Sequence, residues 1–399
     1  MKICMVTDTF WPRINGVSVS ITTLTRALRA LGQEVYIVAP DYSNLPSRRK
    51  FVSGDDDPVE GVIRFPAHSL LFFPEDCSVN VVSRSFIKHV KEIRKMGFDI
   101  IHTHTPLMLG IVSMYWKRGQ GARLVHTFHT LFEEFIPCYY PFCYLPEKIS
   151  RQFSHWFSTN AFHWYCNQFD YIIAPSQQVV DLLQGYYLTP PIDVIPTGIE
   201  LEHLSGGDGA RLRQEWRVEA GEKLLLFAGR VGFEKGIDLI LRAMPHIHQH
   251  APPARLVIVG EGPAEGTLRK IAAELGITPW VHFAGYRPYA EMADVYAAAD
   301  LFLFSSQTES QGLVTIEAMA SGTPVVAVRG PGTLDQLENE AGGLLSPPDE
   351  IAFAKQVVRL LTDDALYARK VSEARQRADD FTSLAMARRV LAVYESLLA

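Results

Sequence analysis

KICMVTDTFWPRINGVSVS (residues 2–20) and KLLLFAGRVGFEKGID (residues 223–238) begin alike, each with a short and uninterrupted apolar run. Runs of this kind suit strands that are buried on both faces of a parallel sheet. A glycine-containing loop follows each run, and an amphipathic helix follows the loop. After the first run, apolar residues recur at helical spacing from Ile21 to Leu31, and Gly32 closes the helix. The two halves therefore predict two strand–loop–helix units of one type.

Strand-like runs alternate with helical segments along the whole chain. We expect strands at 34–40, 61–65, 98–102, 123–127, 170–175, 192–196, 223–228, 255–260, 281–285, 300–304 and 324–328. We expect helices at 237–249, 264–275, near 290–298 and from about 314, and helices dominate after residue 349. This alternation is typical of α/β folds with parallel sheets.

The length of 399 residues favours two domains over one core. We predict two Rossmann-like, doubly wound domains that face each other across a cleft, with a hinge near residues 196–200. The N-terminal domain covers 1–196 and the C-terminal domain covers 197–381. We expect a last helix, at about 382–399, to pack back on the first domain.

Composition narrows the class of protein. A hydrophobic content of 47% and a charged content of 21% fit a soluble globular chain. No apolar run reaches the roughly 18 residues that a membrane span needs, and the N-terminus lacks the layout of a signal peptide, so we expect a cytoplasmic location. Five cysteines without a C-x-x-C pair favour reduced thiols. The net charge of −6 argues against nucleic-acid partners.

Special residues fall where strands end. Ligands of open α/β sheets bind outside the carboxyl ends of the strands. Asn15-Gly16 follows the first strand, His129 follows the strand at 123–127, and Arg230 and Lys235 follow the strand at 223–228. The stretch SQTESQGLVTIEAMASG (306–322) follows the strand at 300–304. All four sets would face one cleft if the two domains face each other.

The chemistry of these loops points to a diphosphate. Arg230 and Lys235 are two cations at the start of a helix, and a helix N-terminus already carries free N–H groups and partial positive charge. A second helix opens at Gly312, Leu313 and Val314, whose backbone N–H groups can point at a phosphate, and Gly312 permits a close approach.

Glu309 and Glu317 stand eight residues apart around this helix start. A carboxylate beside a phosphate would repel it, so the two glutamates are better suited to accept hydrogen bonds from hydroxyl groups of a sugar or a ribose. A diphosphate together with such hydroxyl groups indicates a nucleotide sugar.

These motifs resemble those of a known family. The E-x7-E spacing followed by AMASGTPVVAV (318–328) resembles the donor-binding signature of retaining GT-B glycosyltransferases of family 4. GRVGFEKGID resembles the Arg/Lys diphosphate motif of that family, NGVSVS resembles its N-terminal glycine loop, and HTFHT resembles its acceptor-side histidine motif. The resemblance covers residues 1 to about 399, with the motifs in the expected order.

The resemblance implies roles for the matching positions. Glu309 would contact the transferred sugar near its 3- and 4-hydroxyl groups, and Glu317 would bind the ribose. Arg230 and Lys235 would hold the diphosphate and stabilise its charge as it leaves. Gly16 would let its loop approach the phosphate or the acceptor, and His129 would lie beneath the anomeric centre. The reaction would retain the anomeric configuration, by displacement on the front face within an ion pair.

The resemblance also implies a metal-independent enzyme with no cofactor, because cations and helix dipoles take the place of a metal ion. Asp55–Asp57 match the D-x-D metal motif of the other large glycosyltransferase fold. That motif follows a strand in its own fold, whereas here it precedes one in a polar loop. We interpret Asp55–Asp57 as loop residues.

Every candidate residue also has an ordinary structural explanation. Glu309 could be a solvated loop acid, Glu317 a surface helix residue, Lys235 a turn lysine, Arg230 an ion-pair partner and Gly16 a turn glycine. His102, His104 and His126 are more simply explained as packed histidines. Tyr286 follows a strand end, where flanking the nucleotide base and a structural role remain equally open.

One helix of the N-terminal domain is basic. In SRSFIKHVKEIRK (83–95), Arg84, Lys88, Lys91 and Lys95 share one helical face, and Phe86, Val90 and Ile93 share another. Such a helix can bind an anionic membrane surface, each cation near that surface adding about 1 kcal/mol, and Arg48–Lys50 could add to it. A solvated outer face over a core stripe explains the pattern equally well.

The segment 131–169 is dense in aromatic residues, which suit a membrane interface as well as a helical core or an acceptor groove. TDTFWPRINGVSVSI, FHTLFEEF, IIAPSQ and IPTGIE are most similar to diacylglycerol glucosyltransferases and related glycolipid mannosyltransferases. This favours transfer of a hexose from UDP-glucose to a lipid such as diacylglycerol, at the cytoplasmic face of a membrane.

Two alternatives to a glycolipid enzyme remain. The first is a soluble family 4 transferase, for example one dependent on GDP-mannose, that acts on a sugar, a sugar phosphate or a small metabolite. The second is a binding protein of the NAD-dependent Rossmann type, and the absence of G-x-G-x-x-G after residues 6 and 228 speaks against it.

Overall fold

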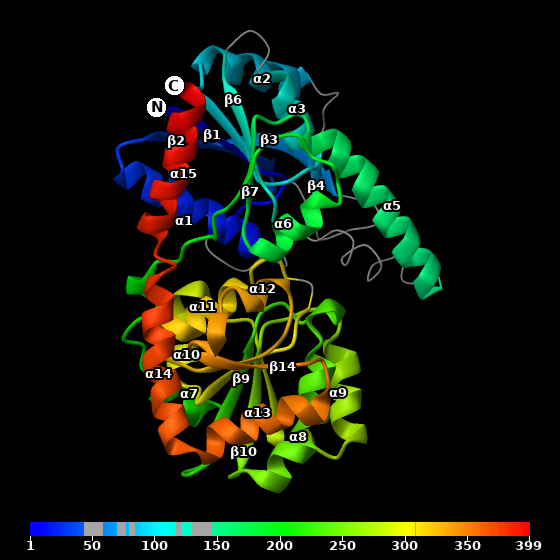
Figure 1. Cartoon of the computed structure of the whole chain (residues 1–399), viewed down its shortest axis with the longest axis vertical. Helices are drawn as coiled ribbons and strands as arrows, with labels where there is room; N and C mark the ends of the chain where they lie inside the picture. The colour runs from blue at the N-terminus through cyan, green and yellow to red at the C-terminus, as the bar shows by residue number, and fades with distance from the viewer. Residues whose placement is uncertain (44–58, 70–76, 80–83, 117–120, 130–145, 308) are drawn as a thin grey trace. The chain divides into compact units, whose positions relative to one another are not determined.

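The computed structural model describes residues 1–43, 59–69, 77–79, 84–116, 121–129, 146–307 and 309–399. The chain forms two compact units: unit 1 consists of Met1–Gly198 and Ser383–Ala399, and unit 2 consists of Ile199–Thr382. Each unit contains one sheet with helices on both faces (Figure 1).

Unit 1 is built on a sheet of eight strands in the order β4-β3-β2-β1-β5-β6-β7-β8. The strands are β1 (Lys2–Val6), β2 (Glu34–Asp41), β3 (Val62–Ser69), β4 (Cys77–Val79), β5 (Ile100–Thr103), β6 (Arg123–Thr127), β7 (Tyr171–Ala174) and β8 (Ile192–Val194). Only the pairing of β3 with the edge strand β4 is antiparallel within the described sheet. The chain order reverses at β1, which lies between β2 and β5.

Six helices of the described residues cover this sheet. They are α1 (Gly16–Ala30), α2 (Arg84–Met96), α3 (Met108–Trp116), α5 (Glu147–Cys166), α6 (Gln177–Gln184) and α15 (Ser383–Leu398). Along β1, Ile3 and Met5 pack in one apolar cluster with α1 and α15, while Cys4 and Val6 pack in the other with α2, α3, α5 and α6. Alternate side chains of the strand are therefore buried on opposite faces, as the uninterrupted apolar run predicts.

Unit 2 is built on six parallel strands in the order β11-β10-β9-β12-β13-β14. The strands are β9 (Lys223–Ala228), β10 (Ala254–Val259), β11 (Val281–Gly285), β12 (Leu301–Phe304), β13 (Val325–Val328) and β14 (Gly343–Ser346). The helices are α7 (Ala210–Glu215), α8 (Ile237–His250), α9 (Glu265–Glu274), α10 (Met292–Ala297), α11 (Leu313–Ala320), α12 (Pro331–Leu334), α13 (Glu350–Thr362) and α14 (Asp364–Asp379).

The strand β9 has the same two-sided burial as β1. Leu225 and Phe227 pack with α8, α9 and α13, and Leu224 and Leu226 pack with α10 and α11. The chain order reverses at β9, which lies between β10 and β12. Both units are thus doubly wound parallel sheets, which confirms the predicted fold class, and each unit has its own switch point at which ligands bind in such folds.

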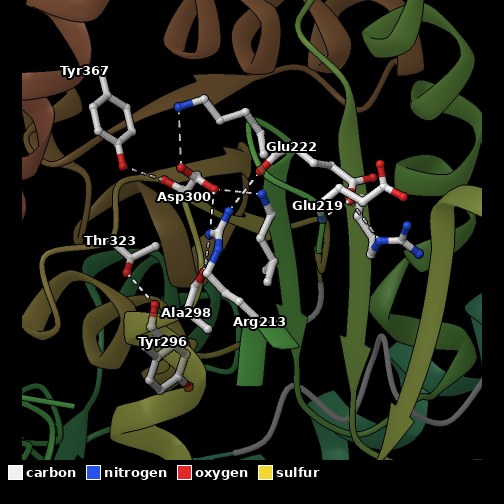
Figure 2. Close-up of polar contacts among 11 residues, drawn as sticks. Arg213, Glu219, Glu222, Tyr296, Ala298, Asp300, Thr323 and Tyr367 are labelled. Atoms are coloured by element: carbon white, nitrogen blue, oxygen red, sulfur yellow. Dashed lines mark hydrogen bonds and ion pairs between the residues drawn. The ribbon is translucent and has the colours of Figure 1, made fainter. Parts of the chain in front are cut away.

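An ion-pair cluster clamps the amino ends of β9 and β12 together (Figure 2). The carboxylate of Asp300 accepts hydrogen bonds from the backbone N–H of Leu224 at 2.7 Å and from Arg213 at 3.0 Å, and Lys223 lies 3.5 Å from it. Arg213 also donates to the carbonyl groups of Ala298 and Glu222, and the Tyr367 hydroxyl donates to the Asp300 carbonyl. The cluster joins α7, β9, β12 and α14 at the edge of the sheet where these strands start.

The expected element boundaries differ from those of the structure by at most four residues, and the largest difference is at β3, which was expected at 61–65 and covers Val62–Ser69. The strand expected at 98–102 covers Ile100–Thr103, and the strand expected at 192–196 ends at Val194. Two strands were not expected, β4 and β14, which have three and four residues. Their sequences, CSV and GLLS, lack the uninterrupted apolar run by which other strands of similar length were recognised. Among the helices of the described residues, none is long and apolar enough to cross a bilayer.

The clamp generates a prediction about stability. Replacing Asp300 by Ala removes the acceptor of Leu224 N–H and leaves Arg213 with an uncompensated charge. We expect Asp300→Ala to lower the free energy of unfolding of unit 2 by about 2–4 kcal/mol. Urea denaturation followed by the fluorescence of buried Trp216 measures it. The exposed Asp379→Ala is the control, and a change as small as that of the control would contradict a clamping role.

Candidate functional site

The loops that follow β9 and β12 lie against each other in unit 2, because the two strands are neighbours in the sheet. The Ser305 hydroxyl donates a hydrogen bond to the carbonyl of Lys235 at 2.8 Å, and the Ser306 hydroxyl reaches the carbonyl of Glu234 at 3.4 Å. A Cβ atom added to Gly236 would lie 2.9 Å from the carbonyl oxygen of Ser305. Two motifs that are 70 residues apart in the chain therefore form one surface.

The charged residues of these loops form two pairs. Arg230 is 2.6 Å from the carboxylate of Glu234, whose side chain is almost fully buried. The ammonium of Lys235 directly contacts the carboxylate of Glu309, and both side chains are largely buried. Lys235 and Glu309 therefore lie side by side, and Glu234, a residue to which the sequence assigned no role, orients Arg230.

Two helices begin at this surface, and a left-handed glycine precedes each. Gly236 (φ 61°) caps α8, and Gly312 (φ 74°) caps α11. Positive φ favours glycine at both positions, and a Cβ atom on Gly312 would also approach Phe304 to 3.1 Å. Since glycine offers no capping side chain, the first-turn N–H groups of the two helices can receive an anion instead.

Glu317 lies on the buried face of α11. The hydroxyl of Tyr296, on α10, donates a hydrogen bond to its carboxylate at 2.6 Å. Burial raises the pKa of Glu317, and the hydrogen bond from Tyr296 acts in the opposite direction. The sequence did not identify Tyr296, because nothing in its local pattern indicates a partner 21 residues away.

Tyr286 follows β11, which is two strands away from β9. Its side chain is partly exposed. The neighbouring Arg287 forms an ion pair with Glu215, lies 3.5 Å from Glu291 and sits over the ring of Trp216, so that Arg287 holds this corner of unit 2 together. The strand β10 therefore lies between the strand that precedes Tyr286 and the strand that precedes Arg230.

In unit 1, the loop after β1 leads into α1 through a capping box. The Asn15 side chain accepts a hydrogen bond from Ser18 N–H, and the Asn15 N–H donates to the Ser18 hydroxyl, both at 2.9 Å. Gly16 is the first residue of α1, and a Cβ atom added there would meet no described atom within 4 Å. Neither positive φ nor packing within the described residues requires glycine at position 16.

Asp8 also follows β1, and its position in the sequence did not predict a role for it. Its buried carboxylate accepts hydrogen bonds from the Thr105 hydroxyl at 2.9 Å and from the backbone N–H of Leu109 at 2.8 Å, so it caps the start of α3. Burial raises the pKa of Asp8 to about 6, although these hydrogen bonds act in the opposite direction. An acid directly after a buried strand is the sequence signal that could have identified it.

His129, which follows β6, is oriented by a second histidine. His104 Nε2 lies 3.3 Å from the sulfur of Met5, and His104 Nδ1 lies 3.0 Å from His129 Nε2. A thioether sulfur can only accept a hydrogen bond, so neutral His104 carries its proton on Nε2 and accepts at Nδ1. His129 therefore donates from Nε2, and its Nδ1 is the acceptor nitrogen of the ring.

The other histidines belong to the interior of unit 1. His102 lies 2.6 Å from both the Tyr394 hydroxyl on α15 and the Thr127 hydroxyl, and His126 lies 2.7 Å from the Thr103 hydroxyl. Burial lowers the pKa of all four rings: that of His126 to about 3, that of His129 to about 4, and those of His102 and His104 well below 6.5. All four histidines are neutral at pH 7.

The basic face of α2 is on the surface of unit 1. Arg84, Lys88, Lys91 and Lys95 are exposed, while Phe86 and Ile93 are buried against the sheet. Glu92 lies 3.9 Å from Lys88 and offsets part of this charge. Arg48–Lys50, Asp55–Asp57 and the aromatic residues of 130–145 lie outside the residues that the structure describes.

Comparison with known proteins identifies both halves of the chain. Residues 14–203 match the family model "Glycosyltransferase Family 4", and residues 208–377 match "Glycosyl transferases group 1". The alpha-monoglucosyldiacylglycerol synthase of Streptococcus pneumoniae is 31% identical over 82% of this chain and 71% of its own. The D-inositol 3-phosphate glycosyltransferase of Frankia alni is 30% identical over 96% of this chain and 95% of its own.

Solved structures share the fold. The sucrose-phosphate synthase of Thermosynechococcus elongatus superposes with a TM-score of 0.77 at 24% identity, over 99% of this chain and 98% of its own. The Anabaena protein HepE in complex with UDP-glucose superposes with a TM-score of 0.74 at 20% identity, over 99% of this chain and all of its own.

The buried histidines generate a prediction about pH. Their folded pKa values lie below the unfolded value of about 6.5, so the unfolded chain binds more protons between the two values. The free energy of unfolding of unit 1 should therefore fall as the pH is lowered from about 6.5 towards 4, by up to about 1.4 kcal/mol per pH unit for each histidine. Asp8, whose folded pKa of about 6 lies above its unfolded value, acts in the opposite direction in this range, but it is one group against four.

Denaturation at a series of pH values tests this, and His126→Phe should reduce the slope. The exposed His155→Gln should leave the slope as in the wild type. A slope that does not change in His126→Phe would show that His126 contributes no proton linkage.

Proposed function

The chain belongs to the GT-B glycosyltransferases of group 1 and family 4, and from this premise we propose that it transfers glucose from UDP-glucose to diacylglycerol, with retention of the anomeric configuration. The observation that carries the donor half of the proposal is the single surface formed by the loops after β9 and β12. It presents two cations, two helix N-termini and a carboxylate on adjacent loops of unit 2.

Each part of this surface suits one part of a nucleotide sugar. Arg230, Lys235 and the N–H groups that follow Gly236 and Gly312 would hold the diphosphate. Glu309 would accept hydrogen bonds from sugar hydroxyl groups. Its contact with Lys235 would fix the position of the sugar relative to the diphosphate. Glu317 would accept from the ribose, with Tyr296 holding its carboxylate in place. That HepE was crystallised with UDP-glucose supports this choice of donor.

The proposed reaction needs no general base from the protein. The bond between the anomeric carbon and the diphosphate oxygen breaks, and the acceptor hydroxyl bonds to the same face of that carbon. The acceptor proton passes to the departing phosphate oxygen. Arg230 and Lys235 stabilise the charge of the leaving group, and neutral His129 would offer the sugar a polar ring without a charge. No step is assigned to a metal ion or a cofactor.

The acceptor is proposed on two grounds. A relative 31% identical over most of the chain is named a monoglucosyldiacylglycerol synthase. The exposed cations of α2 would attract an anionic membrane surface, from which a lipid acceptor could be reached. Together they favour a peripheral enzyme at a membrane.

A soluble acceptor is the second candidate. The Frankia alni relative, named for D-inositol 3-phosphate, matches nearly the full length of both chains. In that case the basic face of α2 is solvated and has no membrane partner.

Incubation with UDP-glucose or GDP-mannose and either diacylglycerol in mixed micelles or inositol 3-phosphate separates the two candidates. We expect a glucosylated lipid with UDP-glucose, and thermal stabilisation by UDP above that by GDP or ADP. Glycosylation of inositol 3-phosphate, without any glycolipid product, would replace the first candidate by the second.

Substitution of the donor residues tests the site. We expect Arg230→Ala, Lys235→Ala and Glu309→Ala each to reduce kcat by about 100- to 1,000-fold, because each removes a preorganised charge from the transition state. Lys270→Ala, an exposed lysine on α9, is the matched control and should keep wild-type turnover. Near-normal turnover in any of the three site variants would remove that residue from the proposed mechanism.

Gly16 provides a test that separates function from folding. Because no described atom lies near an added Cβ, Gly16→Ala should keep or slightly raise the melting temperature. If a ligand approaches this position, transfer should fall by about 10- to 100-fold through misplacement of the reacting groups. Gly266→Ala on α9, which is equally open, should likewise keep or slightly raise the melting temperature and should leave transfer unchanged. Full activity in Gly16→Ala would show that no ligand approaches the glycine.

A further inference from the structure

The N-terminal part of helix α5, up to Ser158, is amphipathic in the reverse sense to a surface helix. Its buried positions include three serines at intervals of four, Ser150, Ser154 and Ser158, each at most 1% exposed. Five large apolar side chains of the helix are exposed instead: Ile149, Phe153, Trp156, Phe157 and Trp164, between 38% and 62% exposed. A surface helix normally buries its apolar stripe and exposes its polar one.

These five residues form one continuous stripe, which we call the α5 aromatic face. They stand at positions i, i+4, i+7, i+8 and i+15, which brings them onto one side of a helix. The ring of Phe153 packs against that of Phe157, with centroids 6.0 Å apart, and against that of Trp156, at 6.3 Å. The rings therefore cluster while they remain open to solvent.

Exposed apolar side chains are concentrated on α5 and are not spread evenly over the described surface of the protein. Fourteen large hydrophobic side chains are exposed among the described residues, and five of them belong to this one helix. The C-terminal part of α5 is anchored in unit 1, where Phe162 packs against Phe128 and Tyr186. The helix extends past the sheet of unit 1 (Figure 1). A rigid helix thus presents apolar rings to the outside, an arrangement that marks an interaction site.

The chemistry of α5 favours a lipid surface as the partner. Tryptophan and phenylalanine are the side chains that amphipathic helices place at the boundary between headgroups and acyl chains. Lys148 and Arg151 are exposed on the same helix, and Glu147 is its only acidic residue. On the same unit, α2 exposes the cations Arg84, Lys88, Lys91 and Lys95. Exposed apolar rings and exposed cations on one unit complement an anionic bilayer.

We propose that α5 is a membrane-inserting element, whose aromatic face enters the interfacial region of an anionic bilayer and holds unit 1 at the lipid surface. This inference rests on the proposed function, because a diacylglycerol acceptor resides in a bilayer. The basic face of α2 would attract the protein to the bilayer through charge alone, and salt screens that attraction. The α5 aromatic face would add apolar insertion, which salt does not screen.

Binding to vesicles made of equal parts phosphatidylcholine and phosphatidylglycerol tests the proposal. We expect Phe153→Ser/Trp156→Ser/Phe157→Ser to weaken binding by at least about 100-fold, since one inserted aromatic side chain contributes roughly tenfold or more. The loss should persist at high salt. Lys88→Glu/Lys91→Glu should instead weaken binding at low salt and have little effect at high salt.

Two substitutions serve as matched controls, Gln152→Ser on another side of α5 and Leu398→Ser at the end of α15, both exposed. Neither should change vesicle binding. Trp156→Phe should retain binding, and brominated lipids should quench the wild-type tryptophan emission more than that of Trp156→Phe. Because the substituted rings are exposed, the triple variant should unfold in urea at the wild-type midpoint.

The outcomes separate this inference from the proposed function. Wild-type vesicle binding by the triple variant at high salt overturns the inference, whether or not diacylglycerol is glucosylated. A wild-type protein that is oligomeric without lipid, and a triple variant that is monomeric, would assign the face to a second copy and also overturn it. If the wild type inserts α5 but glucosylates no lipid, the inference stands and the proposed acceptor fails. We expect the triple variant to keep its activity on a short-chain diacylglycerol in solution.

Discussion

The parallel pairing of β9 with β12 is the constraint on which the proposed donor site depends. These strands are separated by about 70 residues in the chain, and they pair through Leu225 and Leu226 with Leu301 and Phe302. Asp300 clamps their amino ends, so their carboxyl ends emerge side by side. Each strand then leads through a left-handed glycine into a helix. Two cations, a carboxylate and two helix N-termini consequently meet without any one segment having to supply them all.

Within that surface, charge is organised before any ligand binds. Lys235 contacts Glu309 and Arg230 contacts Glu234, so each cation is held by a carboxylate on a short loop. A site assembled in this way loses little side-chain entropy on binding, because its side chains are already ordered. In unit 1 the organisation is of another kind. Burial keeps four histidines neutral, and a chain of contacts from Met5 through His104 determines which nitrogen of His129 donates.

The surface of unit 1 carries two helices, α2 and α5, that the sequence pattern does not distinguish. Both α2 and α5 carry apolar residues at helical spacing, but α2 buries Phe86 and Ile93 whereas α5 leaves Phe153, Trp156 and Phe157 exposed. The first is an ordinary surface helix with a charged outer side. The second exposes aromatic side chains on the side that would ordinarily be buried. This contrast is the reason why we propose electrostatic attraction for α2 and insertion into lipid for α5.

The sequence by itself determined the class of fold, the order of most elements and the family. Uninterrupted apolar runs such as 2–6 and 223–227 specify buried parallel strands, and the motifs around Arg230, Lys235, Glu309 and Glu317 are the basis on which a nucleotide-sugar ligand is proposed. It could not reveal the partners Tyr296 and His104, the cap formed by Asp8, the short strands β4 and β14, or which side of α5 is buried. Periodicity reports only which residues share a face. Which face meets the core, and which distant side chain completes a hydrogen bond, depends on contacts between segments far apart in the chain, and the tertiary structure alone decides them.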